Sequence, residues 1–275
     1  MRKILIVGIL ALFSLSAVAG AITADEITLT NNDEITEIQE VSADFTHTTF
    51  IEYASTTWCP YCAPASEDLF SIYESGDYPF YYVSLISDVN TIAGKRMNSL
   101  GVYSIPAAYF DSGYIIEVGA VGETQYRTVL EETGMRSVKQ PLEMTTDVTW
   151  DGDAEITVTV TVTNNGNFFY FGILRSYVTE IESRWNNNDG DPYHFGFLDF
   201  AIKKLVFIPK GQTKSFTATF DGKEDHGGLT FEDITQGNIM VVSTVSHWIP
   251  KLKTNDAGVP YITFYVDQTS AGTPI

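Results

Sequence analysis

Strand-like and helix-like patterns of hydrophobic residues alternate along the first half of the chain. Residues 48–54 are rich in β-branched and aromatic side chains, which predicts a strand. Apolar residues then recur at helical spacing between residues 65 and 73, and Gly76 ends this predicted helix. Residues 80–86 are apolar at almost every position, as expected of a strand buried on both faces. The ordered part of the chain therefore begins with a strand, a helix and a central strand.

The alternation continues to about residue 133. A shorter helix is predicted over residues 91–100. Two apolar runs on either side of the turn Asp111-Ser112-Gly113 predict a hairpin, and a helical stripe over residues 126–133 follows. The predicted order is β-α-β-α-β-β-α, in a domain that spans residues 46–140.

The pattern changes after Gln140, where strands and turns replace helices. Residues 142–150 alternate between apolar and polar, and residues 156–163 alternate Ile or Val with Thr, the clearest period of two in the chain. Further strand-like runs lie at 168–179, 216–220, 239–246 and 261–266. Several strands at this spacing predict an antiparallel, immunoglobulin-like sandwich over residues 141–275.

The N-terminus has the features of an export signal. Arg2 and Lys3 precede an apolar run, which ends in the small residues Ala17-Val18-Ala19. We predict a signal peptide over residues 1–21, followed by an acidic linker over residues 22–45. Cleavage is expected, with an uncleaved membrane anchor as the alternative. The protein is therefore expected outside the cytoplasm, as a secreted, periplasmic or cell-surface protein.

Composition excludes several classes of partner and cofactor. The 16 basic and 35 acidic residues give a net charge of −19, which argues against nucleic acid or an anionic membrane surface as a partner. Membrane contact is expected only through an uncleaved signal segment. Two cysteines are too few for a cysteine zinc site, and no two of the four histidines lie at ligand spacing. We expect no metal and no cofactor.

One polar loop, at residues 186–191, resembles a calcium-binding loop in composition. An EF-hand register that places Gly190 sixth puts Trp185 first and Gly196 twelfth, where carboxylates are needed. A solvated turn is the favoured interpretation, and a looser calcium site stays open.

Both cysteines, Cys59 and Cys62, lie where the first predicted strand runs into the first helix. We expect Cys59 at the helix N-terminus, where unpaired N–H groups and the helix dipole stabilise a thiolate. Pro60 suits the first helical turn, and Cys62 lies close enough to resolve a mixed disulfide. A structural disulfide and half of a zinc knuckle are the alternatives. The first would close too small a loop to stabilise much, and the second lacks its other ligands.

Two motifs carry a family resemblance. The sequence Trp58-Cys59-Pro60-Tyr61-Cys62, in this order of elements, resembles the thioredoxin superfamily of thiol-disulfide oxidoreductases. Residues 100–107 match the stretch before that family's third strand. The resemblance covers about residues 45–139 and implies helices on both faces of a central sheet.

The resemblance also implies roles for individual residues. Pro106 would be a cis-proline that lies against the cysteine pair, and Ile105 would offer its backbone to an extended substrate. We assign Tyr61 to substrate binding as well, and Trp58 and Pro60 to the support of the cysteines.

Glu52 is a candidate by position for the carboxylate that this family often buries under its second cysteine to move protons. The segment from Glu52 to Trp58 is one residue longer than usual, however. A Glu52 that faces solvent on its strand is the alternative.

These observations lead to two hypotheses. The first is an exported thiol-disulfide oxidoreductase that exchanges disulfides with exported proteins and with an unidentified redox partner, in a direction that the spacing does not give. The second is a cell-surface binding or adhesion protein, in which the thioredoxin-like fold is a scaffold and the sandwich binds the partner. An aromatic-rich stretch bears on the second hypothesis, with core as the favoured interpretation and a partner groove as the alternative: Trp185, Tyr193, Phe195, Phe197 and Phe200.

Overall fold

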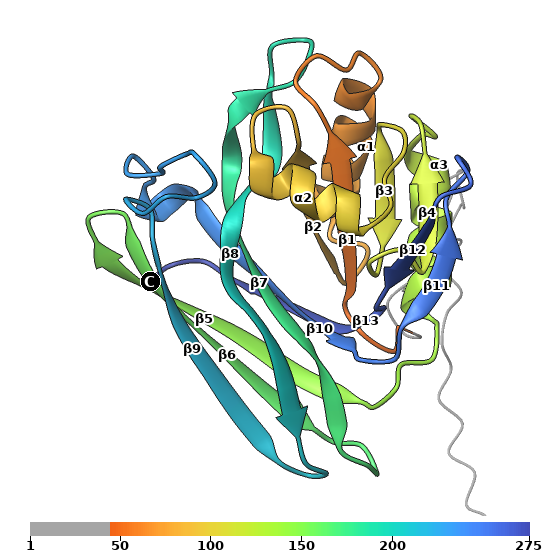
Figure 1. Ribbon diagram of the computed structural model, residues 1–275, viewed down its shortest axis with the longest axis vertical. Coiled ribbons are helices and arrows are strands. Elements are labelled where there is room, and N and C mark those ends of the chain that lie inside the picture. The colour runs from red at the N-terminus through yellow and green to blue at the C-terminus, as the bar shows by residue number, and fades with distance from the viewer. Residues whose placement is uncertain (1–44) are drawn as a thin grey trace, which may run out of the picture. The chain divides into compact units, whose positions relative to one another are not determined.

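The computed structural model describes residues 45–275. The predicted signal peptide, and the predicted linker except for Phe45, lie outside the described residues. All the described residues belong to one compact unit. Its described part is mostly β-structure, with three α-helices (Figure 1).

The first seven elements follow the predicted order. They are β1 (Thr49–Ser55), α1 (Cys62–Ser75), β2 (Phe80–Ile86), α2 (Thr91–Ser99), β3 (Ala107–Phe110), β4 (Ile115–Val118) and α3 (Glu123–Gly134). Strand β1 pairs with β2 in parallel and with β3 in antiparallel orientation, and every residue of β1 is buried. The position of β1 between two strands explains why its sequence is an unbroken buried run.

The remaining elements are strands and one short 3₁₀ helix, Gln236–Asn238. The strands are β5 (Leu142–Gly152), β6 (Glu155–Asn164), β7 (Tyr170–Asn186), β8 (Pro192–Ile208), β9 (Thr213–Asp221), β10 (Ile239–His247), β11 (Lys251–Thr254), β12 (Pro260–Thr263) and β13 (Val266–Gly272). Strand β8 coincides with the aromatic-rich stretch that the sequence did not assign to a strand.

One eight-stranded sheet runs across the sequence boundary near Gln140. Its strand order is β13-β10-β7-β8-β2-β1-β3-β4, and a single residue pair, Ser84 with Gly196, joins β2 to β8. The Ser84 hydroxyl strengthens this junction by donating a hydrogen bond to the His194 carbonyl at 2.7 Å. Sequence character changes near Gln140, but hydrogen bonding continues from one side of the boundary to the other.

Two hydrophobic cores lie on this sheet. The first joins β1, β2 and α1 to aromatic residues of β7 and β8, including Tyr177, Tyr193 and Phe197, each with no exposed surface. The second lies between the three-stranded sheet β5-β6-β9 and residues of β7, β8 and β10, with Val160 and Leu174 among its members. The aromatic stretch therefore serves mainly as core, as favoured from the sequence.

The helices cover opposite faces of the sheet around β1. The Tyr53 hydroxyl reaches the first residue of α1, whereas the Glu52 carboxylate pairs with Arg96 of α2. Neighbouring strand residues point to opposite faces, so α1 and α2 lie on different sides. None of the helices within residues 45–275 is long and apolar enough to span a membrane.

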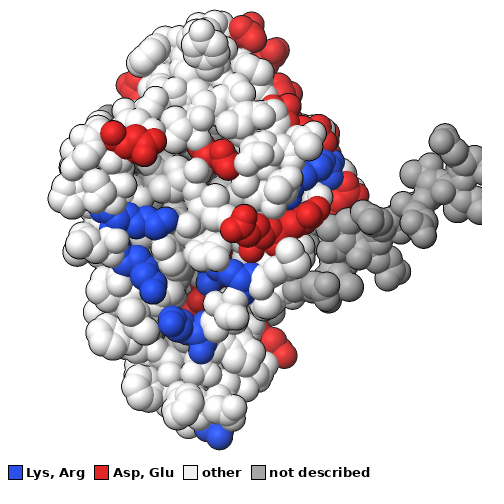
Figure 2. Space-filling model, turned by 90° about the vertical axis from the view of Figure 1, so that its right-hand side faces the viewer, with Lys and Arg blue, Asp and Glu red and all other residues white. Residues whose placement is uncertain are grey.

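Charge is distributed unevenly over the surface. Lys and Arg side chains gather on part of the face shown in Figure 2, although the whole chain has a net charge of −19. A strongly acidic total therefore does not make every part of the surface acidic.

Candidate functional site

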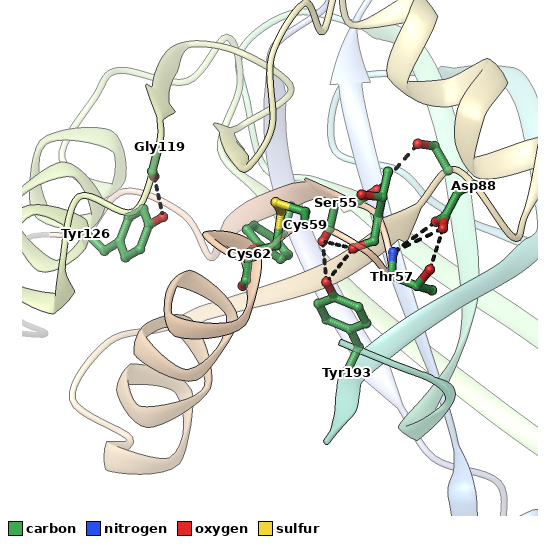
Figure 3. Close-up of a disulfide and its surroundings, with 11 residues drawn as sticks. Ser55, Thr57, Cys59, Cys62, Asp88, Gly119, Tyr126 and Tyr193 are labelled. Atoms are coloured by element: carbon green, nitrogen blue, oxygen red, sulfur yellow. Dashed lines mark hydrogen bonds between the residues drawn. A yellow bond between two sulfur atoms is a disulfide. The ribbon is translucent and has the colours of Figure 1, made fainter. Parts of the chain in front are cut away.

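Cys59 and Cys62 are joined by a disulfide, with their Cα atoms 5.3 Å apart (Figure 3). Cys59 retains 3% of its surface and Cys62 retains none. The cysteines belong to the first core, and Cys59 is the member of the pair that solvent reaches.

The cysteine pair lies slightly earlier relative to the helix than predicted. Helix α1 begins at Cys62, and the Cys59 carbonyl accepts a hydrogen bond from the Cys62 N–H at 3.1 Å, which closes a separate turn. The prediction placed Cys59 at the helix N-terminus and Pro60 in the first helical turn, and it was wrong by about three residues, because the helix begins at Cys62. Pro64 occupies that first turn, where a missing N–H leaves no helical hydrogen bond unmade.

The start of α1 is electrostatically favourable for a thiolate. The helix has 14 residues, and its first turn contains no acidic side chain. The positive end of the helix dipole is therefore not neutralised by a carboxylate within that turn. A thiolate formed beside it on reduction of the disulfide is stabilised.

Buried tyrosine hydroxyls hold the backbone on both sides of the cysteine turn. Tyr53 of β1 donates a hydrogen bond to the Cys62 carbonyl at 2.6 Å. Tyr193 of β8 donates to the Thr56 carbonyl at 2.9 Å and lies 2.6 Å from the Ser55 hydroxyl (Figure 3). The turn is thus fixed by the strand that leads into it and by a strand of the C-terminal part.

A carboxylate completes this support. Asp88, which follows β2, accepts hydrogen bonds from the backbone N–H of Thr57 at 3.0 Å and from the Thr57 hydroxyl. Neither Tyr53 nor Asp88 was predicted as a site residue from the sequence, and Tyr193 was predicted only as a member of the aromatic stretch. Their contacts with the turn depend on the fold, although a polar residue directly after a buried strand is a weak signal for Asp88.

The sheet register brings Pro106 to the end of β1 from which the cysteine turn departs. Ala54 pairs with Ala107, so Pro106 lies next to Ser55. Pro106 is buried, the Ile105–Pro106 peptide bond is cis, and the Pro106 carbonyl accepts a hydrogen bond from Gly119 at 2.8 Å. Among the hydrogen bonds of residues 45–275, none involves the backbone of Ile105.

Two aromatic side chains flank the disulfide and face solvent. Trp58 is 64% exposed and Tyr61 is 68% exposed. Together with the unpaired backbone of Ile105, they offer both apolar surface and hydrogen-bonding groups near Cys59.

Glu52 has a different environment from either of those predicted. It is completely buried, so the interpretation that it faces solvent was wrong. Its carboxylate accepts hydrogen bonds from Arg96 at 2.8 Å, Ser112 at 2.9 Å and Tyr177 at 2.7 Å. Burial alone would raise the pKa of Glu52, but Arg96 and the hydrogen bonds outweigh burial and lower it. These donors lie on the α2 side of the sheet, away from α1.

The loop at residues 186–191 is closed by its own hydrogen bonds. The Asn187 side-chain oxygen accepts from the N–H groups of Asp189 and Asp191, and the Asn187 N–H donates to the Asp191 carbonyl at 2.7 Å. Across residues 45–275, no group of three or more His, Cys, Asp or Glu side chains is arranged to hold a metal ion.

Comparison with known proteins gives structural likeness alone. No family model and no curated protein matches the chain. Among solved structures, HBP35 of Porphyromonas gingivalis aligns with a TM-score of 0.62 at 14% identity, over 84% of this chain and 76% of that one.

Two other solved structures align less well. A protein of Agrobacterium tumefaciens gives a TM-score of 0.44 at 15% identity, over 83% of this chain and 95% of that one. A β-glucosidase of Kluyveromyces marxianus gives 0.28 at 13% identity, over 50% of this chain and 14% of that one. The likeness to HBP35 is thus the one of the three that indicates a shared fold, and at 14% identity it indicates the fold alone.

Proposed function

We propose that this chain is an exported thiol-disulfide oxidoreductase that acts through Cys59 and Cys62. The observation that carries the proposal is the position of this disulfide in a turn at the start of α1, with Cys59 as the more exposed of the two residues. A pair so placed can alternate between dithiol and disulfide without rearrangement of the fold.

We interpret residues 49–134 as a thioredoxin-like unit, and β5–β10 with β13 as an immunoglobulin-like sandwich fused to it. The parallel pair β1–β2, the antiparallel pair β1–β3 and the hairpin β3–β4 support the first interpretation. The packing of the β5-β6-β9 sheet over β7, β8 and β10 supports the second.

The exchange reaction needs two steps, and each step conserves atoms and electrons. In the reducing direction, the Cys59 thiolate attacks one sulfur of a substrate disulfide, and the other substrate sulfur leaves as a thiolate. The Cys62 thiolate then attacks the Cys59 sulfur of the mixed disulfide, which releases the second substrate thiolate and forms the Cys59–Cys62 bond. Oxidation of a substrate dithiol is the same sequence in reverse.

The substrate is proposed to be an extended segment of another exported protein. Trp58 and Tyr61 provide exposed apolar surface beside Cys59. The backbone of Ile105 supplies a donor and an acceptor, which suit a peptide in an extended conformation. Pro106, buried next to the end of β1, shapes the floor of this surface.

Location outside the cytoplasm is part of the proposal. The predicted signal sequence supports it, and so does the disulfide, because disulfides persist in oxidising compartments. The unidentified redox partner that renews the pair is expected in the same compartment.

Trapping of mixed disulfides tests the activity. Cys62→Ser leaves Cys59 without its resolving partner, so covalent complexes with exported proteins should accumulate and should dissolve on addition of a reductant. Cys59→Ser should form none and should neither reduce insulin nor support oxidative refolding. The double variant controls for effects on folding.

The reduction potential of the Cys59–Cys62 couple then gives the direction of exchange. A wild-type protein that lacks both insulin reduction and oxidative refolding across a series of redox buffers would refute the proposal.

A second candidate function is binding by the sandwich. Aromatic side chains stay exposed near the ends of β7, β8 and β10: Phe168 at 70%, Phe169 at 59%, Phe207 at 48% and Trp248 at 51%. Such a patch is typical of an interaction surface. Under this hypothesis the cysteine variants keep full binding to the cell-surface partner, and Phe168→Ser with Phe169→Ser loses it.

A further inference from the structure

A cavity of about 470 Å³ lies on the α2 side of the sheet. It is lined by residues of α2, β7 and β8 and by residues 262–264, at and after the end of β12. Glu52, on the same side, pairs with Arg96 of this lining. Since Tyr53 and α1 occupy the opposite face, the cavity is separate from the cysteine site.

The lining is rich in positive charge. Four cationic side chains contribute to it: Lys95, Arg96, Arg175 and Lys203. Lys95 and Lys203 are exposed at its edge, whereas Arg175 is only 7% exposed. The cavity thus has a buried positive group with further positive groups at its opening.

Arg175 forms no ion pair with any residue between 45 and 275. Its Nε and Nη1 atoms are buried, and no residue in the described range 45–275 accepts a hydrogen bond from either atom. An unpartnered buried guanidinium is costly, and burial together with Arg96 lowers the pKa of Arg175. A hydrogen-bond acceptor at Nε or Nη1 would stabilise this group, and residues 45–275 supply none.

The strand register places a second positive side chain directly beside Arg175. Arg175 of β7 pairs directly with Lys203 of β8. Side chains of directly paired residues lie on the same face, and like charges in that arrangement destabilise a sheet. An anion between Arg175 and Lys203 would convert this repulsion into attraction.

The nearby carboxylates are already engaged. Glu52 binds Arg96 in two hydrogen bonds, and Asp199 lies 2.9 Å from Nδ1 of His226. Only Arg96 of the four cations has a carboxylate partner among the described residues, so Lys95, Arg175 and Lys203 have none.

The rest of the wall is apolar and aromatic. Phe200, Phe264, Ile92 and Ile262 line the cavity beside the charged groups. This combination suits a ligand with one charged end and one apolar end.

We propose that this cavity binds a small organic anion whose carboxylate or phosphate group is held by Arg175 and Lys203 and whose apolar part packs against Phe200 and Phe264. A guanidinium binds either head group in two parallel hydrogen bonds, so the shared chemistry is an anionic group that presents two acceptor oxygens. The proposal does not depend on the exchange activity of the cysteines.

Calorimetric titration of the full chain with four probes tests this site. Benzoate and phenyl phosphate have both an anionic group and an aromatic ring. Benzyl alcohol lacks the negative charge, and inorganic phosphate lacks the aromatic ring. We expect saturable binding of one equivalent of benzoate or phenyl phosphate, with weaker binding of both controls. The preferred probe of the two identifies the head group.

Substitutions locate the site. Arg175→Met should weaken binding of the preferred probe by about tenfold or more, the scale of a lost hydrogen bond to a charged group. Lys203→Gln should weaken it by about twofold to fivefold, because Lys203 is exposed and its charge is screened. Lys210→Gln, an exposed lysine outside the cavity, should leave the affinity unchanged.

Each possible result bears on the proposal. If neither aromatic anion binds, or if benzyl alcohol binds equally well, the proposed charge recognition is wrong. If Arg175→Met does not fold, the comparison of Lys203→Gln with Lys210→Gln decides, and equal affinities overturn the site. The Cys59→Ser, Cys62→Ser double variant should bind like the wild type whether or not the cysteines exchange disulfides.

Discussion

Two fully buried carboxylates, Glu52 and Asp111, tie distant segments together. Asp111 lies 2.7 Å from His47 Nε2 and accepts hydrogen bonds from Arg136 at 2.7 Å and from the Phe50 N–H at 3.1 Å. Burial would raise the pKa of Asp111, but His47 and Arg136 outweigh it and lower the pKa. Both acids are therefore held in the charged form that their partners require.

Replacement of Glu52 by Gln should lower the free energy of unfolding by about 3–5 kcal/mol, because Arg96 is left as a buried charge without its carboxylate. Urea unfolding at pH 7 measures the change. Glu143→Gln, at an exposed position, is the matched control and should change stability by less than about 0.5 kcal/mol. Equal stabilities of the two variants would contradict the energetic importance of the pair.

The pH dependence of stability follows from the same residue. Because the pKa of Glu52 is lowered from its ordinary 4.5, its contribution is fully present above that value and is lost as the pH falls through the lower folded value. The Glu52→Gln variant should therefore lose less stability than the wild type between about pH 5 and pH 3, measured by urea unfolding at each pH. Asp111, whose pKa is also lowered, contributes to the acid sensitivity that the variant keeps.

At the scale of elements, the junction of β2 with β8 depends on Gly196. A side-chain Cβ at this position would overlap the side chain of Ser183, whose Cβ would lie 2.7 Å away. Gly196 also forms the one residue pair through which β8 joins β2. The missing side chain lets β8 lie close to Ser183 of β7 at the same position where β8 pairs with β2.

Gly196→Ala should therefore destabilise the protein by about 1–3 kcal/mol, the usual cost of an added methyl group in a closely packed site. Gly237→Ala is the control, since nothing lies within 4 Å of its added Cβ, and it should be neutral or slightly stabilising. Thermal melts of the two variants measure the difference. A Gly196→Ala variant as stable as Gly237→Ala would show that Ser183 yields without cost.

The hydrophobic pattern of the sequence predicted the helices and strands whose periodicity is regular. The strands and helices between residues 49 and 134, and the threonine-valine alternation of β6, were visible because their periodicity is regular. Strand β8 was not assigned, because Tyr193, Phe195 and Phe197 recur at every second position but the alternation breaks at Leu198, where the pairing of β8 with β7 is also irregular. The cysteine motif located the candidate site, but it did not predict the side chains that hydrogen-bond to the cysteine turn. Tyr193 lies 137 residues from Thr56, and no local pattern reports a hydrogen bond over that separation.

On the scale of the whole described unit, a shared sheet and shared cores make separate unfolding of the two parts costly. Residues of β7, β8 and β10 contribute to both cores. We therefore expect a single cooperative transition, with coincident curves from tryptophan fluorescence and near-ultraviolet circular dichroism. Two resolved transitions would show that the parts on either side of Gln140 unfold independently.

The shared core also determines whether a fragment of the protein can fold alone. Residues 141–275 expressed alone would expose Tyr177, Tyr193 and Phe197, which are fully buried in the intact unit. Such a fragment is expected to aggregate or remain unfolded, since it loses the core that covers these side chains.

The hydrogen bond from Tyr193 to Thr56 can form only after the ribosome has synthesised Tyr193, long after the two cysteines. A ribosome makes Cys59 and Cys62 well before it makes Tyr193, and at about 5–20 residues per second the 137-residue separation takes roughly 7–27 seconds. During that interval the nascent thiols lack the tyrosine that later fixes the backbone ahead of them. The two thiols of the nascent chain are therefore without this backbone support until the last third of synthesis.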